Sequence, residues 1–193
     1  MKILCLSNNA CAEPLWKWLE EKGHEVIRAS EKLDIDWCRD EQFDLAVSYT
    51  YKYILTKELL DALNGNVVNI HNSYLPFNRG ASPNLWSIVD GTPRGVTLHY
   101  MDEKLDRGYI ICQKLVTEGD GDTLASSYAN LDKCAIEMFK SAFEVYDYWQ
   151  DMKKLPEGKG TYHSVKDTEY ITSQIDTYDM KIDELLTKLG KRQ

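Results

Sequence analysis

Short apolar runs alternate with helical patterns through the first part of the chain. The apolar runs cover residues 2–6, 24–28, 43–48 and 66–70. Between the first two runs, residues 13–21 place Leu15, Trp16 and Leu19 on one helical face. A second helix is expected up to Leu63, with Thr56 as its N-cap. This alternation predicts a doubly wound α/β sheet that is mostly parallel.

The remaining elements follow the same reasoning from apolar spacing and caps. We expect a short helix over residues 83–89, strands over 96–101 and 109–116, and a long helix from a Thr123 cap to Met152. The chain then becomes more polar, and a last helix is expected near residues 179–189. The sequence therefore predicts one domain over residues 1–153, followed over 154–193 by an appendage of hairpin and helix.

Polar residues that follow strands of a doubly wound sheet meet at one edge, where ligands bind. Asn69 and His71 lie two apart at the end of a predicted strand, so both side chains point to the same side of the sheet. They are either site residues or residues that satisfy loop backbone groups. The acidic loop over residues 102–108 is either a solvated turn or a source of a carboxylate for His71. His99 is as well explained by strand packing as by catalysis.

Composition excludes several functional classes. The chain has 31 acidic and 23 basic residues and a net charge of −8, which disfavours binding to nucleic acid or to an anionic membrane. No apolar run approaches the roughly 20 residues of a membrane span. The five cysteines contain no C-x-x-C pair, and the four histidines are dispersed, so we expect no metal site. Polar Asn8 and Asn9 come too early for a signal peptide, and a cytoplasmic protein is expected.

Three motifs follow one another between residues 68 and 113. Residues 68–76 contain the pattern N-x-H-x-S-x-L-P, which resembles the signature of folate-dependent formyltransferases. Residues 79–86 resemble the R-G-x-x-P-x-x-W stretch of the branches of that family that modify tRNA and sugars, and residues 95–113 resemble the family's G-V-T-x-H…D-x-G-x-I-I-x-Q block. The resemblance implies a doubly wound formyltransferase fold and makes Asn69, His71 and Asp106 a catalytic trio.

The resemblance also implies a role for each residue. Formyl transfer from 10-formyltetrahydrofolate to an amine passes through a tetrahedral oxyanion, to which Asn69 and His71 donate hydrogen bonds. Asp106 accepts the proton that the amine loses and holds His71 in position. No metal is required. The pterin ring is expected against two segments, which contribute Tyr53, Ile54, Leu55, Met101 and Asp102.

The identity of the acceptor amine is suggested by comparing this sequence with the separate branches of the family, where it resembles one branch and differs from two others. Methionyl-tRNA formyltransferases carry a further C-terminal barrel, for which we expect too few residues after Lys153. Glycinamide ribonucleotide formyltransferases have a glycine-rich phosphate loop after the first strand, where residues 7–12 contain no glycine. Residues 80–88 and 160–167 look most like sugar N-formyltransferases, although the latter segment alone reads as an ordinary polar connection.

We therefore expect a dTDP- or UDP-linked amino-deoxysugar, destined for surface polysaccharide, as the acceptor. Asn8, Asn9 and Arg79 lie near the predicted edge and are candidates for substrate binding. Two alternatives stay open: glycinamide ribonucleotide as the acceptor, and a folate-binding relative without catalysis. The presence of the whole trio weakens the second alternative. The long helix and the polar tail offer a surface for a homodimer.

Overall fold

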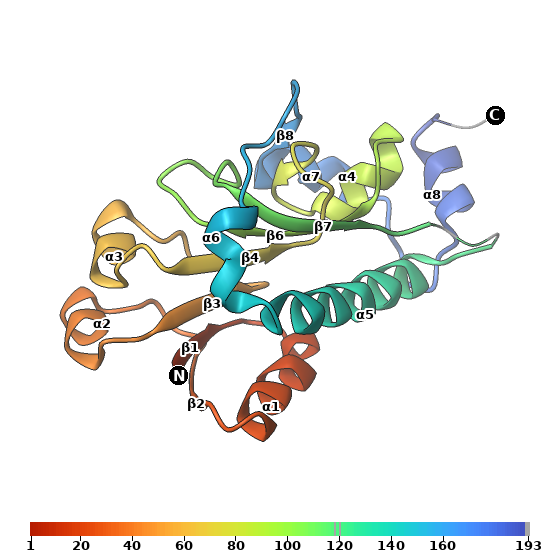
Figure 1. Ribbon diagram of the computed structural model, residues 1–193. Coiled ribbons are helices and arrows are strands. Elements are labelled where there is room, and N and C mark those ends of the chain that lie inside the picture. The colour runs from red at the N-terminus through yellow and green to blue at the C-terminus, as the bar shows by residue number, and fades with distance from the viewer. Residues whose placement is uncertain (118, 120, 192–193) are drawn as a thin grey trace.

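A six-stranded sheet runs through the centre of the molecule, with the strand order β2-β1-β3-β4-β6-β7 (Figure 1). The computed structural model describes residues 1–117, 119 and 121–191. The strands of the sheet are β1 (Lys2–Leu6), β2 (Glu25–Ala29), β3 (Leu45–Tyr49), β4 (Val67–His71), β6 (Gly95–Tyr100) and β7 (Ile110–Leu115). Strands β2, β1, β3 and β4 pair in parallel, whereas β6 and β7 join antiparallel. The predicted α/β, mostly parallel sheet is confirmed.

Helices cover both faces of this sheet, so the fold is doubly wound. They are α1 (Glu13–Glu21), α2 (Ile35–Glu41), α3 (Lys57–Ala62), α4 (Pro83–Asp90), α5 (Leu124–Phe143), α6 (Trp149–Met152), α7 (Val165–Thr172) and α8 (Ile182–Lys188), with 3-10 turns η1 (Ala10–Ala12) and η2 (Tyr146–Tyr148). The predicted caps are present, since Thr56 and Thr123 accept from backbone N–H groups in the first turns of α3 and α5.

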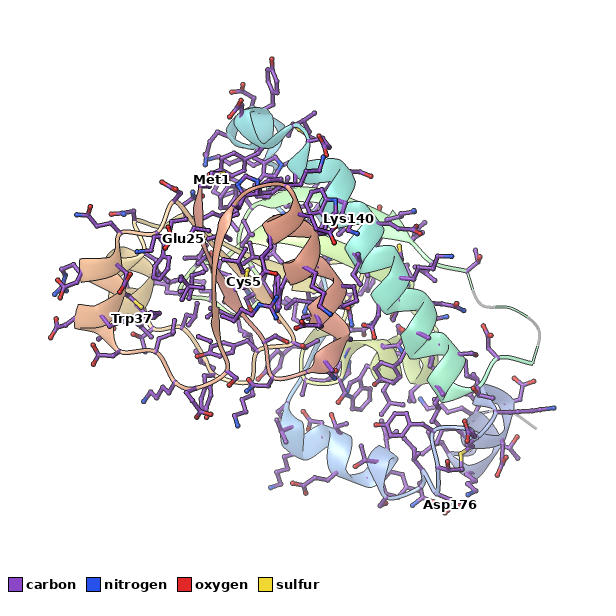
Figure 2. All side chains as sticks on the ribbon, turned by 90° about the horizontal axis from the view of Figure 1, so that it is seen from below. Met1, Cys5, Glu25, Trp37, Lys140 and Asp176 are labelled. Carbon is purple, nitrogen blue, oxygen red and sulfur yellow. The ribbon has the colours of Figure 1, made fainter. Side chains whose placement is uncertain are left out.

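Alternation along the strands gives each face its own core. Ile3, Cys5 and Val47 are buried against α1 and α5. Figure 2 shows these two helices side by side, with Cys5 on the strand behind them. Leu4 and Val67 are buried on the opposite face, under α2 and α3. Because side chains alternate along β4, Asn69 and His71 project from the α2/α3 face, on the same side as Val67.

The long helix predicted to reach Met152 is wrong beyond Phe143, because the chain breaks there and continues as η2 and α6. Trp149 is the physical reason. Its indole is fully buried, donates a hydrogen bond of 2.9 Å to the Ala142 carbonyl, and packs edge-on against Phe139 and Phe143. Burying this indole against the end of α5 requires the chain to turn back, which a straight helix does not allow.

The residues after Lys153 pack against the rest of the chain. Ile171, Met180 and Leu185 share a buried cluster with Leu85 and Ile88 of α4, at the upper right of Figure 1. A two-stranded parallel sheet joins β5 (Arg79–Gly80) to β8 (Tyr162–His163). The expected last helix is confirmed as α8, whereas α2 and α7 were not anticipated from the sequence. Across the described residues, 1–117, 119 and 121–191, no helix is long and apolar enough to cross a bilayer.

Candidate active site

The structure brings Asn69, His71 and Asp106 together at the carboxyl end of β4. Asn69 and His71 project from one face of that strand, and Asp106 comes from the loop between β6 and β7. His71 Nδ1 lies 3.8 Å from Asp106 Oδ1, and their side chains are only 7% and 8% exposed. Two of the three residues come from one strand, but Asp106 reaches them only because its loop folds back over the sheet edge.

Backbone features of the loop explain how Asp106 reaches the site. A Cβ atom on Gly108 would lie 1.8 Å from the Tyr100 carbonyl oxygen, so only glycine lets the loop return this close to β6. Asp106 itself has a φ of 52°, a left-handed conformation that is strained for a residue with a side chain. The Gly80 N–H donates to Asp106 Oδ2 at 2.8 Å and holds the carboxylate in place.

The hydrogen bonds of His71 determine which ring nitrogen faces the site. Nε2 lies 3.2 Å from the carbonyl oxygen of Asn78. A carbonyl oxygen only accepts, so Nε2 carries a proton and donates it. Nδ1 is therefore the nitrogen that faces Asp106, at a distance too long for a direct hydrogen bond.

The chain that follows β4 is tied to the sheet beside it. Thr97 of β6 accepts from the Leu75 N–H at 3.1 Å and donates to the Ser73 carbonyl at 2.7 Å. Gln113 of β7 donates to the Leu75 carbonyl at 2.8 Å. These bonds fix the segment that leads from His71 to the carbonyl of Asn78.

His99 is the residue that sequence reasoning left undecided, and the structure places it beside the trio. It is 1% exposed and is the cross-strand partner of Asn69. Its Nδ1 lies 2.9 Å from the Tyr100 carbonyl and donates to it, which leaves Nε2 to accept from the Asn69 amide at 3.4 Å. Nε2 is also 3.7 Å from Asp106 Oδ1. Burial lowers the pKa of His99, against the opposing effect of Asp106, so the ring is neutral at neutral pH.

The residues expected at the pterin lie in two segments of the same region. Leu55 is buried in the α2/α3 core, and Met101 packs against that core. Ile54, by contrast, is 74% exposed. Tyr53 is half-buried and makes an edge contact with a neighbouring tyrosine, while exposed Asp102 accepts from the Lys104 N–H. The core contacts of Leu55 and Met101 put both segments on the face from which Asn69 and His71 project.

The residues expected at the substrate have different environments. The Asn8 side chain donates to the Ser30 carbonyl at 2.6 Å and accepts from the Lys52 N–H at 2.9 Å, which joins the loops after β1, β2 and β3. Asn9 caps η1 by accepting from a backbone N–H. The structure thus gives the side chains of both asparagines hydrogen bonds within the loops that follow the strands.

Arg79 is close to the trio because the next residue, Gly80, is bonded to Asp106. Its Nε donates to the Thr161 carbonyl at 3.1 Å. Burial lowers the pKa of Arg79, the charge of Arg107 lowers it further, and Asp106 raises it. Two guanidinium groups therefore stand near the Asp106 carboxylate.

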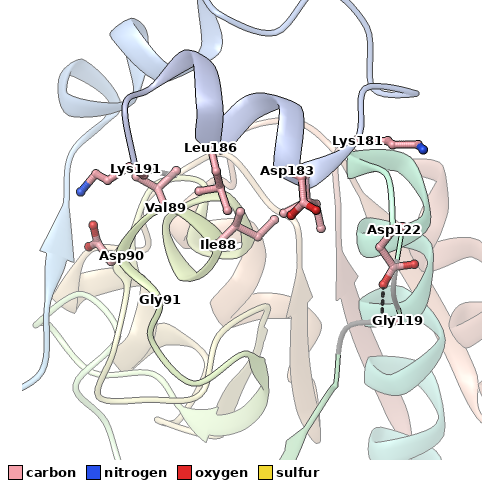
Figure 3. A pocket seen from close by; sticks show the side chains of 12 residues that line it. Ile88, Val89, Asp90, Gly91, Gly119, Asp122, Lys181, Asp183, Leu186 and Lys191 are labelled. Atoms are coloured by element: carbon pink, nitrogen blue, oxygen red, sulfur yellow. Dashed lines mark hydrogen bonds between the residues drawn. The ribbon is translucent and has the colours of Figure 1, made fainter. Parts of the chain in front are cut away.

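Two other features do not belong to this site. Trp86 has one face of its indole covered by the His163 ring, at a centroid distance of 3.7 Å. A hollow between α4 and α8 is lined by apolar and charged side chains of both signs, among them Ile88, Asp90, Lys181 and Leu186 (Figure 3). It contains none of the site residues expected from the sequence.

A family model for formyl transferase matches residues 4–142 of the chain. The chain belongs to the formyl transferase family. A dTDP-4-amino-4,6-dideoxyglucose formyltransferase from Mycobacterium bovis is 33% identical over 131 residues, which are 68% of this chain and 55% of that protein. A methionyl-tRNA formyltransferase from Fusobacterium nucleatum is 36% identical over 112 residues, 58% of this chain and 36% of that protein. The chain spans about half the length, or less, of these curated relatives.

Solved structures resemble the chain over most or all of its length. The formyltransferase PseJ from Anoxybacillus kamchatkensis, in complex with UDP-4,6-dideoxy-4-formamido-L-AltNAc and tetrahydrofolate, is 34% identical. The match covers 100% of both chains with a TM-score of 0.85. A sugar N-formyltransferase candidate from Mycobacterium tuberculosis is 29% identical, with a TM-score of 0.74 over 88% of this chain and 78% of that one.

Proposed function

We propose that this protein is an N-formyltransferase that moves a formyl group from 10-formyltetrahydrofolate to the amine of a nucleotide-linked amino-deoxysugar. The proposal rests on the trio at the end of β4. It is supported by the likeness along its whole length to a formyltransferase that was solved with a UDP-linked formamido sugar and tetrahydrofolate. A relative that acts on a dTDP-linked amino sugar gives further support.

The gap between His71 and Asp106 is the observation that carries the proposal. His71 Nδ1 and Asp106 Oδ1 face each other 3.8 Å apart, and neither has a hydrogen to donate when the imidazole is neutral and the carboxylate ionised. A nitrogen with two N–H bonds donates to both when it lies about 2.9 Å from each atom, to one side of the line that joins them. A primary amine has this property, whereas an alcohol with one O–H does not, so the pair favours an amine as the acceptor.

The side chains divide the work of the transfer. 10-Formyltetrahydrofolate supplies the formyl group. As the acceptor nitrogen bonds to the formyl carbon, negative charge grows on the formyl oxygen, and the second N–H of the Asn69 amide donates to it. Asp106 takes a proton from the attacking nitrogen and passes it to His71 Nδ1, which then donates a hydrogen bond to the same oxygen. The bond from the formyl carbon to the folate nitrogen then breaks, and that nitrogen takes up this same proton, which leaves both side chains as they began.

The expected pterin segments fit a flat, partly apolar ring. Ile54 is 74% exposed although it is one of the more apolar side chains, and Leu55 beside it is buried. An apolar side chain held in water beside a site gains free energy when a ring covers it. Peptide groups of residues 53–55, in a segment without regular structure, are available to pair with the polar edge of a pterin.

The two guanidinium groups beside Asp106 suit the diphosphate of a nucleotide sugar. Arg79 and Arg107 immediately precede and follow the residues of the Gly80–Asp106 hydrogen bond. Within the described part of the chain, neither side chain forms an ion pair with a carboxylate, so their charge is available to an anion. We assign the diphosphate to this pair, with Asn8 and Asn9 holding the neighbouring loop edge in shape.

Incubation with 10-formyltetrahydrofolate and a panel of acceptors tests the proposal. The panel contains glycinamide ribonucleotide and several dTDP- and UDP-linked amino sugars, each paired with the analogue that has a hydroxyl in place of the amine. We expect a formyl mass gain on at least one amino sugar and on none of the hydroxyl analogues. Gain on glycinamide ribonucleotide alone would contradict the sugar assignment.

The His71→Ala variant separates transfer from a folate-binding role without catalysis. We expect this variant to lose turnover while binding tetrahydrofolate with an affinity close to that of the unaltered protein. If the unaltered protein binds tetrahydrofolate but formylates no member of the panel, the protein is a binding relative and not the proposed enzyme.

A further inference from the structure

Residues 160–163 lie directly on the loop that follows β4. A Cβ atom on Gly160 would lie 1.8 Å from the Pro76 carbonyl oxygen, so the two backbones touch as only a glycine permits. Next to this contact, β8 pairs with β5, and the Arg79 and Ala81 N–H groups donate to the Thr161 and His163 carbonyls at 3.1 and 2.9 Å. The segment from the last part of the chain thus covers the loop that leads away from His71.

The Thr161 hydroxyl forms hydrogen bonds with Asn78, which lies 83 residues earlier in the chain. Thr161 Oγ1 accepts from the Asn78 N–H at 2.7 Å and donates to the Asn78 side-chain oxygen at 3.1 Å. The Asn78 amide nitrogen donates to Thr92 at 2.7 Å. Asn78 is fully buried and has a φ of 52°, so its unusual backbone conformation depends on these partners.

Asn78 in turn fixes His71. The Asn78 carbonyl is the acceptor of the His71 Nε2 proton, at 3.2 Å. One threonine hydroxyl therefore holds both the backbone N–H and the side chain of Asn78. The carbonyl of the same residue decides which nitrogen of the histidine carries the proton. With the proton held at Nε2, the lone pair of Nδ1 faces Asp106 and the space for the acceptor amine.

We propose that Thr161 is a positioning residue for His71, acting through Asn78. This inference rests on the proposed function, and it assigns a role in the reaction to a residue outside the three motifs around the trio. A threonine that only filled space would be replaced without consequence by valine, which has nearly the same shape. The relay instead requires the hydroxyl, because Oγ1 both accepts and donates.

Thr161→Val and Thr161→Ser form the matched pair that tests the relay. We expect Thr161→Val to lower kcat by about 10- to 100-fold, with KM for both substrates changed by no more than about twofold, since misplacement of a catalytic group by a fraction of an ångström has effects of this size. Thr161→Ser keeps the hydroxyl and is expected to retain kcat within about threefold.

Nitrogen-15 spectra of the imidazole rings give a readout that needs no turnover. In the unaltered protein and in Thr161→Ser, the His71 signals should be those of a ring protonated at Nε2. In Thr161→Val they should move to the averaged values of a ring that exchanges between tautomers. If the unaltered protein transfers no formyl group, the proposed function fails, while these spectra still decide the relay.

Two results would overturn the relay. One is a Thr161→Val protein with kcat and His71 signals unchanged. The other is a fall in kcat with the Nε2 signal preserved, because the effect would then not pass through His71. If Thr161→Val does not fold, Thr161→Ala decides instead, since it removes the hydroxyl and places no extra methyl group beside Asn78. Unchanged His71 signals in that variant would likewise reject the relay.

Discussion

The contacts among the trio and His99 are longer than the hydrogen bonds that hold these residues from outside. Within the site, His71 and Asp106 are 3.8 Å apart, His99 and Asp106 3.7 Å, and Asn69 and His99 3.4 Å. In the supporting layer, Gly80 bonds Asp106 at 2.8 Å and Thr161 bonds Asn78 at 2.7 Å. The supporting hydrogen bonds have ordinary lengths, whereas the distances between the central side chains are longer than those of ordinary hydrogen bonds.

This difference indicates a site that is held in shape around the space for a reactant. Two non-glycine residues that flank His71 in space, Asn78 and Asp106, have left-handed backbones, and each is held by short bonds from another segment. Strain of this kind persists only where the surroundings impose it. The strained backbones lower stability at the support, and the bonds that hold them keep the central groups 3.7–3.8 Å apart. In the proposed reaction, this separation lets one acceptor amine contact both His71 and Asp106.

Asp106→Asn tests the open centre, and we expect the largest effect from it. The amide keeps an oxygen for the Gly80 N–H, so the supporting bond survives, but the proton acceptor is lost. We expect kcat to fall by about 10³-fold, within the range for loss of a general base. Formyl mass gain over time measures the effect. Glu103→Gln, at an exposed position in the same loop, is the control and should stay near the unaltered rate. Near-normal turnover of Asp106→Asn would show that the acceptor loses its proton elsewhere.

Arg107→Gln tests whether the edge of the site binds the diphosphate. Arg107 is exposed and follows Asp106 directly, so its loss should weaken substrate binding and leave the chemistry intact. We expect KM for the nucleotide sugar to rise by about tenfold, the size of one charge-assisted contact to phosphate, with kcat little changed. Lys104→Gln, an exposed cation in the same loop, controls for general charge. An equal rise in both variants would assign the effect to overall charge and not to Arg107.

The pH dependence of stability tests how the site keeps His99 neutral, and its effect is the smallest of the three. Burial lowers the pKa of His99 in the folded protein, so on acidification the unfolded chain takes up a proton near pH 6.5 before the folded protein does. Stability is therefore lost as the pH falls below about 6.5 toward the folded pKa.

Urea unfolding at pH 7 and pH 5 measures this loss. We expect His99→Gln to show a shallower fall in stability between the two pH values than the unaltered protein. His24, whose pKa burial also lowers, is present in both proteins and cancels in the comparison. An identical fall in both proteins would mean that His99 titrates in the folded state as it does in the unfolded chain.

Much of the fold was predictable because local patterns and caps agree with it. The apolar runs of the first part became strands, and Thr56 and Thr123 cap helices as expected. The long helix failed at Phe143 because the burial of Trp149 is a tertiary effect that helical spacing does not contain. The two-residue strands β5 and β8 leave no periodicity to read, since each exists only through its pairing with the other.

The residues of the site likewise fall into those that local patterns predict and those that only the fold or the family resemblance indicates. Asn69 and His71 were accessible from the sequence because a spacing of two on a strand fixes a common face. Residue patterns alone did not decide which acidic residue of the 102–108 loop reaches the site. Only the resemblance to the family indicated Asp106. The sequence placed His99 on a predicted strand. Its position opposite Asn69 depends on the antiparallel register of β4 and β6, which the sequence does not give.

The sequence by itself determined the alternation of strands and helices, the shared face of Asn69 and His71, and the motifs that place the chain in its family. Only the tertiary structure decided that Thr161 forms a hydrogen bond with Asn78 and that the Asn78 carbonyl accepts the Nε2 proton of His71. The physical reason is the distance along the chain over which each kind of interaction acts. Side-chain periodicity and capping are local properties, whereas a hydrogen bond between residues 83 positions apart depends on how the whole chain packs.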